Sequence, residues 1–258
     1  MLLLIAILPV ILLGIFIYKK DKNGEPKKLL AKLFIGGILS CFLTLLISSF
    51  MEALFPIFAA DTENLTFLGL AIYVFIGIAL VEEFSKFVFA YFISNNENSF
   101  DEIYDAIVYC VFVSLGFAAF ENILYVYENG FGTGVLRALT AVPGHACDGV
   151  FMGYYLGLAK IASVNKNIKL RNKNLLLSLI VPTLLHGIYD FCLFTGEVIF
   201  FLIFIVFVIL LYVHSVKKIN KLSAINNKFI KKDTYCTNCG RLINTNFCGN
   251  CGKKNEYL

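Results

Sequence analysis

One apolar stretch of the sequence ends in VEEFSKF, which carries three ionisable side chains within a single helical turn. Glu82 and Lys86 are four residues apart, so in a helix they share a face and can form an ion pair. Glu83 points about 100° away around the helix axis. A charged residue at the centre of a membrane helix costs about 2.5–3.5 kcal/mol on insertion scales. The three charged residues are therefore expected either to serve a function or to pair with another buried group.

Two histidines in later apolar stretches each share a helix face with a carboxylate. His145 and Asp148 are three residues apart, whereas His186 and Asp190 are four apart. An aspartate at this spacing can orient an imidazole and fix its tautomer. The remaining polar pair deep within an apolar stretch consists of Glu121 and Asn122.

These residue types are suited to the activation of water. A glutamate can act as the general base on water, and a histidine can donate to a developing oxyanion. Alternatively, His145, His186 and a glutamate can hold a catalytic zinc ion that keeps one position open. The sequence contains neither the HExxH of zincins nor the GxSxG of serine hydrolases. Hydrolysis by activated water, with or without a metal ion, is the chemistry that the set predicts.

Long apolar stretches must position these side chains. Hydrophobic residues make up 59% of the 258-residue sequence and charged residues only 16%, which is too few to cover a soluble surface. A bilayer-crossing helix needs about 20 apolar residues. The expected fold is therefore all-α, a polytopic membrane helix bundle of about seven spans in residues 1–215, with its motifs in 82–190. The spans are predicted at 2–18, 33–58, 66–93, 104–127, 135–160, 174–194 and 197–215.

A row of glycines in the fifth predicted span indicates how it packs. Gly144, Gly149, Gly153 and Gly157 recur at helical spacing and form a surface of small residues. Another helix is expected to approach closely along that surface.

The distribution of positive charge predicts the orientation in the membrane. All Lys and Arg residues except Lys86 and Arg137 fall in three segments, 19–32, 160–173 and 216–258, whereas the segment 94–103 contains none. Cytosolic segments of membrane proteins carry this excess of positive charge. We therefore expect a multi-pass protein of the cell membrane, with its N-terminus outside and its C-terminal tail in the cytosol. The predicted cytosolic segments are 19–32, 94–103, 160–173 and 216–258.

The tail contains two CxxC pairs, each ending in Cys-Gly. Four thiolates at this spacing predict a closed, structural zinc site, because a glycine after each pair lets both sulfurs face one ion. A disulfide pair or free thiols are the alternative, disfavoured in a reducing cytosol. We expect a basic linker at 216–234 and a cytosolic zinc ribbon at 235–258 that could bind a cytosolic partner. The zinc ligands are predicted to be Cys236, Cys239, Cys248 and Cys251.

Four motifs together resemble those of a known family. EEFSK at 82–86, FAAFEN at 117–122, the stretch around His145 and HGIYD at 186–190 resemble, in that order, the motifs of the PrsW family of intramembrane proteases. That family is related to the CAAX prenyl protease and bacteriocin-processing group. The resemblance covers the third to seventh spans, and the predicted zinc ribbon lies outside the shared core.

The resemblance implies a glutamic-type intramembrane protease within the lipid bilayer. Such an enzyme makes the first cut in a single-span substrate, with an anti-sigma factor as the example, and so frees a sigma factor. We expect a mechanism without a catalytic metal; a metal-dependent protease using the same His/Glu cluster is the alternative. The resemblance implies catalytic roles for Glu82, Glu83, His145, His186 and Asp190, and supporting roles for Lys86, Glu121, Asn122 and Asp148.

Two hypotheses come from other functional classes. Acids and histidines within spans also form the proton relays of transporters. Transporters usually contain inverted repeats, and the sequence shows no repeat. A noncatalytic receptor or scaffold would explain the tail but not the buried cluster. No nucleic-acid partner is expected.

Overall fold

The computed structural model describes residues 2–224, 234–235, 242–243 and 250–253. The chain divides into two compact units, 1–226 and 227–258. In the second unit, the strands β1 (Thr234–Tyr235) and β2 (Leu242–Ile243) pair in antiparallel fashion. Cys236, Cys239 and Cys248 lie outside the described residues, so the zinc ribbon stays a prediction.

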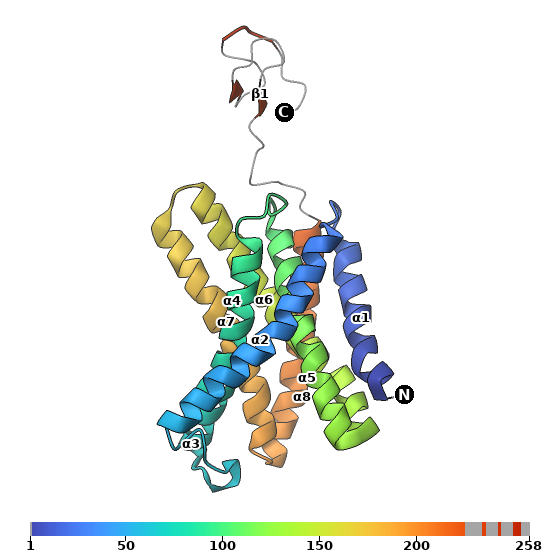
Figure 1. The fold of residues 1–258 in the computed structure, drawn as a ribbon, viewed down its shortest axis with the longest axis vertical. Helices are drawn as coiled ribbons and strands as arrows, with labels where there is room; N and C mark the ends of the chain where they lie inside the picture. The colour runs from blue at the N-terminus through green and yellow to red at the C-terminus, as the bar shows by residue number, and fades with distance from the viewer. Residues whose placement is uncertain (1, 225–233, 236–241, 244–249, 254–258) are drawn as a thin grey trace. The chain divides into compact units, whose positions relative to one another are not determined.

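The first unit is a bundle of long helices (Figure 1), which confirms the predicted all-α membrane fold. Thr66 caps the start of the third span by accepting a hydrogen bond from Gly69 N, and Asn167 caps α7 in the same way through Leu170 N. The helices are α1 (Leu2–Lys20), α2 (Lys27–Leu54), the 3-10 turn η1 (Thr62–Asn64), α3 (Phe67–Ile72), the π-helix η2 (Tyr73–Leu80), α4 (Val81–Ser94), α5 (Ile103–Leu139), α6 (Ala141–Val164), α7 (Ile168–Phe194) and α8 (Val198–Ser223).

Six helical runs among the described residues are long and apolar enough to cross a membrane. The longest, Ile103–Val164, has 62 residues. At 1.5 Å per residue it would extend for about 93 Å, roughly three times the thickness of the hydrocarbon core. It folds back on itself as α5 and α6, so the six runs accommodate the seven predicted spans.

Close contact between α5 and α6 follows the glycine row. A Cβ on Gly149 would meet the backbone of Val111, and one on Gly157 would meet Ile103. The order of these contacts shows that the two helices are antiparallel. Gly144 instead faces the ring of Tyr189 on α7, so the predicted close approach holds for the later part of the row.

A sharp turn inside α5 lies where the predicted spans 104–127 and 135–160 leave a connecting segment at 128–134. Gly130 is the residue with non-helical backbone angles inside α5 (φ 82°, ψ −168°), and the chain resumes a helix directly after it. Residues 131–139 thus form a short helical arm that ends at Thr140. The hydroxyl of Tyr212 on α8 lies 2.9 Å from the Thr140 carbonyl oxygen and so stabilises this second break.

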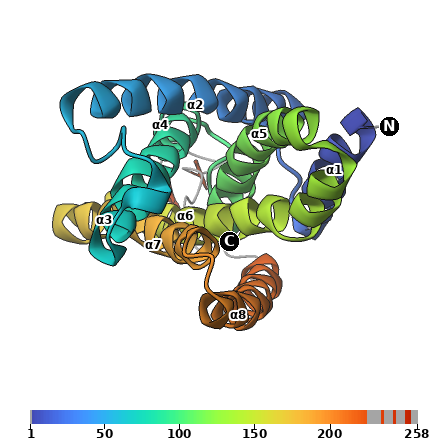
Figure 2. The same ribbon diagram turned by 90° about the horizontal axis from the view of Figure 1, so that it is seen from below.

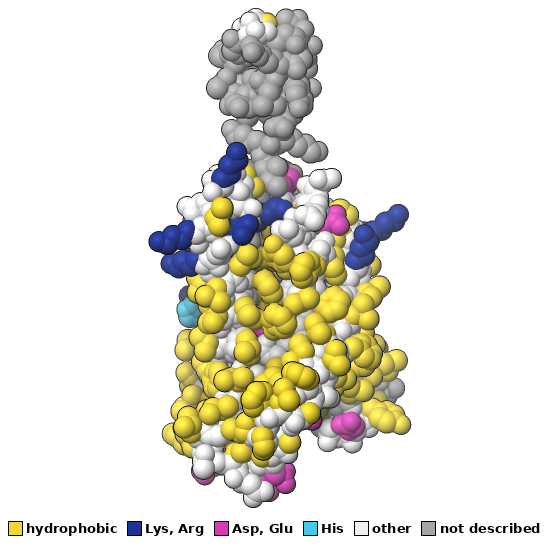
Figure 3. Space-filling model, turned by 60° about the vertical axis from the view of Figure 1, so that its left-hand side comes forward, with side chains coloured by type: hydrophobic (Ala, Val, Ile, Leu, Met, Phe, Trp, Pro, Cys, Tyr) yellow, Lys and Arg dark blue, Asp and Glu magenta, His cyan; other side chains and the backbone are white. Residues whose placement is uncertain are grey.

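Two further helices flank the bundle on opposite sides. In the end-on view, α2 lies along one side and α8 along the other (Figure 2). α8 extends to Ser223, so the first residues of the predicted linker are helical. Apolar side chains cover the visible face of the first unit, and Lys and Arg side chains gather at one end of it (Figure 3).

Candidate active site

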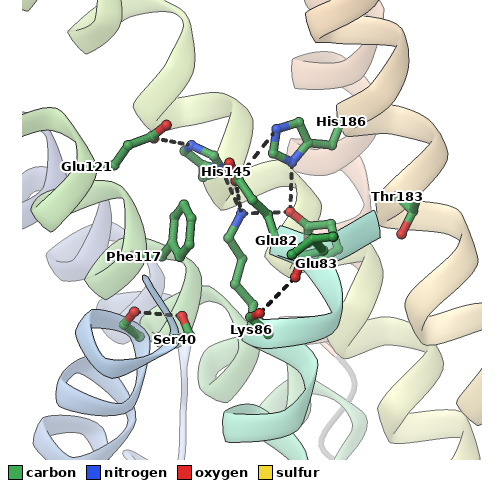
Figure 4. A network of polar contacts seen from close by, with 12 residues as sticks. Ser40, Glu82, Glu83, Lys86, Phe117, Glu121, His145, Thr183 and His186 are labelled. Atoms are coloured by element: carbon green, nitrogen blue, oxygen red, sulfur yellow. Dashed lines mark hydrogen bonds and ion pairs between the residues drawn. The ribbon is translucent and has the colours of Figure 1, made fainter. Parts of the chain in front are cut away.

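Lys86 lies at the centre of a buried polar network (Figure 4) and has no exposed side-chain surface. Its Nζ atom is 3.2 Å from Glu82 Oε2, 2.7 Å from Glu83 Oε1 and 3.1 Å from His145 Nδ1. An ammonium group has three N–H donors, so all three can be satisfied here. Its Nζ also lies 4.0 Å from the centre of the Phe117 ring, within cation–π range. The predicted Glu82–Lys86 pair is present, and Glu83 shares the same lysine.

The π-helix η2 directly precedes the two glutamates. π-helical turns are rare and are frequently found at functional sites. η2 packs against α7, where the ring of Phe75 occupies the space that a Cβ on Gly187 would need. The glycine beside His186 thus permits α7 to approach the helix that carries the glutamates.

His145 connects this network to α5. Its Nε2 is 2.9 Å from Glu121 Oε2, the same oxygen that accepts from Nη2 of Arg137 at 2.7 Å. Because an ammonium cannot accept a hydrogen bond, the Nδ1 atom that faces Lys86 must be the unprotonated nitrogen of His145. The proton is then on Nε2 and is donated to Glu121. The pattern of partners therefore assigns one tautomer to His145.

His186 lies between carboxylates from α4 and from its own helix. Nδ1 is 2.9 Å from Glu83 Oε1, and Nε2 is 3.2 Å from Asp190 Oδ2 and 3.8 Å from Glu82 Oε2. Two ionised carboxylates at the two ring nitrogens are both satisfied only if each nitrogen donates, as in an imidazolium. The imidazole rings of His186 and His145 are 5.3 Å apart, so the two histidines belong to one site.

A cavity of about 90 Å³ opens onto this network. A water molecule occupies about 30 Å³ in the liquid, so the cavity has room for more than one small group. Glu82 lines the cavity, whereas Glu83 and Lys86 lie behind it. The ionisable side chains that line it are Glu82, Glu121, Tyr125, Arg137, His145, Asp148, His186, Tyr189 and Asp190.

Two buried carboxylate oxygens have no hydrogen-bond partner among the described residues, Glu83 Oε2 and Asp148 Oδ1. Asp148 shares a helix face with His145 but does not bond to it, because Lys86 and Glu121 occupy both ring nitrogens. Buried polar atoms without partners are rare in folded proteins and cost free energy. Asp148 is therefore available to a group that enters the cavity.

The supporting pair predicted on α5 has two different roles. Glu121 contacts His145 directly. Asn122 is fully buried behind it and donates from Nδ2 to the Ala6 carbonyl oxygen at 2.9 Å, which ties α5 to α1. Asn122 thus supports the site without facing its cavity.

Arg137 also belongs to the site, although no motif in the sequence indicates it. It lines the cavity and contacts Glu121 and Asn122. The available signal was its isolation, since Arg137 and Lys86 are the two cationic residues outside the basic segments. Sequence spacing could not reveal the contact, because it depends on the break at Gly130.

The donor types around Lys86 match those of a metal site. One ligand atom each from Glu82, Glu83, His145 and His186 can be chosen so that all lie within 4.8 Å of one another. Histidine nitrogens with a carboxylate are a common zinc set. However, the Lys86 ammonium lies among these donors and already takes hydrogen-bonding positions on three of them. With Lys86 in this position, the cluster does not fit an additional divalent cation.

The chain is similar to a family model and to curated proteins. The model described as PrsW family intramembrane metalloprotease matches residues 25–214. A protein of Oceanobacillus iheyensis named Protease PrsW is 41% identical over 224 residues, or 86% of this chain and 97% of that protein. Proteins of the same name from Geobacillus kaustophilus and Bacillus subtilis are each 38% identical; the alignments cover 73% of this chain and 77% and 80% of those proteins. No solved structure matches the chain.

Proposed function

Because the chain belongs to the PrsW family of intramembrane proteases, we propose that it cleaves a single-span membrane protein with water activated by Glu82. An anti-sigma factor is the substrate class that we propose, with sigma-factor release as the consequence. The observation that carries the mechanism is the position of Glu82, whose carboxylate lines the cavity beside two oriented histidines. Glu83 is fully buried and instead connects Lys86 to His186.

The mechanism assigns each proton to a group. Glu82 accepts a proton from water, and the resulting hydroxide attacks the carbonyl carbon of the substrate. The developing oxyanion accepts a hydrogen bond from Nε2–H of His186, which Asp190 orients in the resting site. Glu82 then returns the proton to the leaving amide nitrogen, and the C–N bond breaks to give a carboxylic acid and an amine. Lys86 compensates the negative charge of the two adjacent glutamates throughout.

A metal-dependent reaction that uses the same cluster is the alternative mechanism. The family description includes a metal, and the donor types alone would permit one. The contacts of Lys86 with Glu82, Glu83 and His145 favour the glutamate mechanism, because a second cation among these donors would be repelled. No step of the proposed reaction therefore involves a metal ion.

We also propose that the basic end of the bundle faces the cytosol, so that the N-terminus lies outside. The gathering of Lys and Arg side chains at one end of the first unit supports this orientation (Figure 3). The four cysteines of the C-terminal segment would then bind a structural zinc ion in a reducing compartment. A cytosolic partner of that segment is part of the same proposal.

Co-expression in a bacterial host tests the proposed reaction. The chain would be produced with a panel of tagged single-span anti-sigma factors, and cleavage would be followed by immunoblotting. Glu82→Gln and His145→Ala should reach the membrane in normal amounts and leave the substrate intact. Glu63→Gln is the matched control, since Glu63 is exposed in η1, outside the site. Normal cleavage by both site variants would reject the assignment.

A further inference from the structure

Arg137 reaches the site through the break in α5. It follows Glu121 by 16 residues, and in a straight helix these residues would be about 24 Å apart along the axis. The positive φ of 82° at Gly130 turns the chain instead, so that the helical arm of residues 131–139 runs beside the part of α5 that precedes Gly130. As a result, Nη2 of Arg137 lies 2.7 Å from Glu121 Oε2.

The guanidinium group is held in one orientation by three contacts. Nη2 contacts Glu121, Nε lies 3.0 Å from Asn122 Oδ1, and the group stacks 4.0 Å from the centre of the Tyr125 ring. Its side chain is only 14% exposed. A planar guanidinium with fixed donors positions a carboxylate more precisely than an ammonium would.

The Glu121 oxygen that Arg137 contacts is also the oxygen at hydrogen-bond distance from His145. Glu121 Oε2 accepts both from Arg137 Nη2 and from His145 Nε2. With Nε2 as the donor, Nδ1 of His145 is free to accept from Lys86. Arg137, Glu121, His145 and Lys86 thus form one chain of hydrogen bonds, and its far end lies beside Glu82.

We propose that Arg137 is a positioning residue that acts together with Lys86: through Glu121 it holds His145 in the Nε2-protonated tautomer that the Lys86 contact at Nδ1 requires. This inference rests on the proposed function, because the histidine it orients belongs to the proposed active site. A cation at hydrogen-bond distance favours the charged, acceptor-only form of a carboxylate. Without Arg137, the Glu121 carboxylate can rotate or bind a proton. His145 then loses its acceptor at Nε2, and Lys86 loses a defined acceptor at Nδ1.

A purely structural role for Arg137 would predict something different. In that case Arg137 would only anchor the helical arm, and its loss would lower stability while folded molecules kept the same histidine tautomer. The two roles are therefore separated by a signal from His145 itself, measured in molecules that remain folded.

Nitrogen NMR of the full-length protein labelled with ¹⁵N-histidine in detergent micelles provides that signal. The sequence contains three histidines, and His145→Gln identifies the relevant resonances. In the unsubstituted protein, His145 should be a neutral ring protonated at Nε2. Arg137→Gln should convert it to a mixture of tautomers or to the charged ring, and Arg137→Lys should restore most of the original state. Arg171→Gln is the matched control, because Arg171 bonds to Asn172 at the other end of the bundle.

A cleavage assay with single and double variants completes the test. Loss of a group that orients a catalytic side chain lowers activity by roughly 10–100-fold, judging from partners of metal-bound histidines. Because Arg137 acts through Glu121, the double variant Glu121→Gln with Arg137→Gln should be no slower than Glu121→Gln alone. An unchanged His145 spectrum in Arg137→Gln, or additive losses in the double variant, would overturn the role of Arg137. Cleavage by Glu82→Gln would instead overturn the proposed function.

Discussion

Nζ of Lys86 lies 3.1 Å from Nδ1 of His145, and both residues are buried within the helix bundle. This contact makes the lysine the junction between two halves of the network. One half runs through His145 to Glu121, and the other runs through Glu83 to His186. The charge of Lys86 therefore affects the whole site as well as its neighbour Glu82.

Removal of the Lys86 charge should destabilise the fold. Lys86→Met would leave Glu82 and Glu83 without their shared cation in a water-poor interior. Removing one partner of a buried ion pair typically lowers the free energy of unfolding by about 3–5 kcal/mol. The measurement is the free energy of unfolding in detergent micelles, with Lys169→Met as the exposed control. A loss below about 1 kcal/mol, the level of a surface pair, would contradict this account.

The two adjacent glutamates should differ in their effect on stability. Glu83→Gln should lower both cleavage and stability, because Glu83 Oε1 accepts from Lys86 and from His186. Glu82→Gln should abolish cleavage with a much smaller loss of stability, since Glu82 faces the cavity. Thermal unfolding and cleavage measured on the same preparations check this contrast. Equal destabilisation by the two variants would show that their positions are not distinct.

Close packing of α2 on α5 should tolerate no added methyl group. A Cβ on Gly116 would collide with the carbonyl of Phe34, which is backbone and cannot swing aside. Gly116→Ala should therefore destabilise the bundle by about 1–3 kcal/mol, the usual cost of overpacking. Gly132→Ala is the control, because no atom lies within 4 Å of its Cβ position. Equal unfolding free energies for the two variants would argue against this packing.

Spacing along one helix predicts two of the three expected pairs correctly, but Asp148 does not bond to His145. Lys86 pairs with Glu82, and His186 pairs with Asp190, at the expected helical spacing of four residues. Contacts between helices could not be predicted, because periodicity shows which face is polar but not which face of another helix it meets. The contact of His186 with Glu83, 103 residues earlier, is of this kind. Similarly, the Gly130 turn that returns Arg137 to Glu121 gave no signal beyond a glycine in a short polar segment.

The tail cysteines should account for all bound zinc. Four thiolates form one tetrahedral site, so the purified full-length protein should contain about one zinc ion per chain. Replacement of Cys236, Cys239, Cys248 and Cys251 by serine should remove that zinc and leave cleavage intact. Metal analysis by mass spectrometry, together with the cleavage assay, checks both statements. Zinc that remains in the active serine variant would instead support the metal-dependent alternative.

A buried carboxyl between α1 and α2 should make stability depend on pH. Burial raises the pKa of Glu25 above its ordinary value of 4.5, and the nearby Asp21 acts in the same direction. For an acid with a raised pKa, the stabilising contribution is fully present below pH 4.5 and is lost as the pH rises through the folded-state value. Glu25→Gln keeps an acceptor for the hydroxyl of Tyr109 and should reduce this loss. Unfolding free energies at several pH values test this, and identical pH profiles for the two proteins would contradict it.

We propose that Glu82 activates water for peptide-bond cleavage within the membrane without a metal ion. The most direct test is cleavage of a purified single-span anti-sigma factor in liposomes containing the purified chain and a strong chelator, with the products identified by mass spectrometry. We expect the unsubstituted protein to cut the substrate even in chelator, and Glu82→Gln to make no cut. Cleavage by Glu82→Gln at the normal rate, or complete loss of cleavage in chelator that added zinc restores, would contradict it.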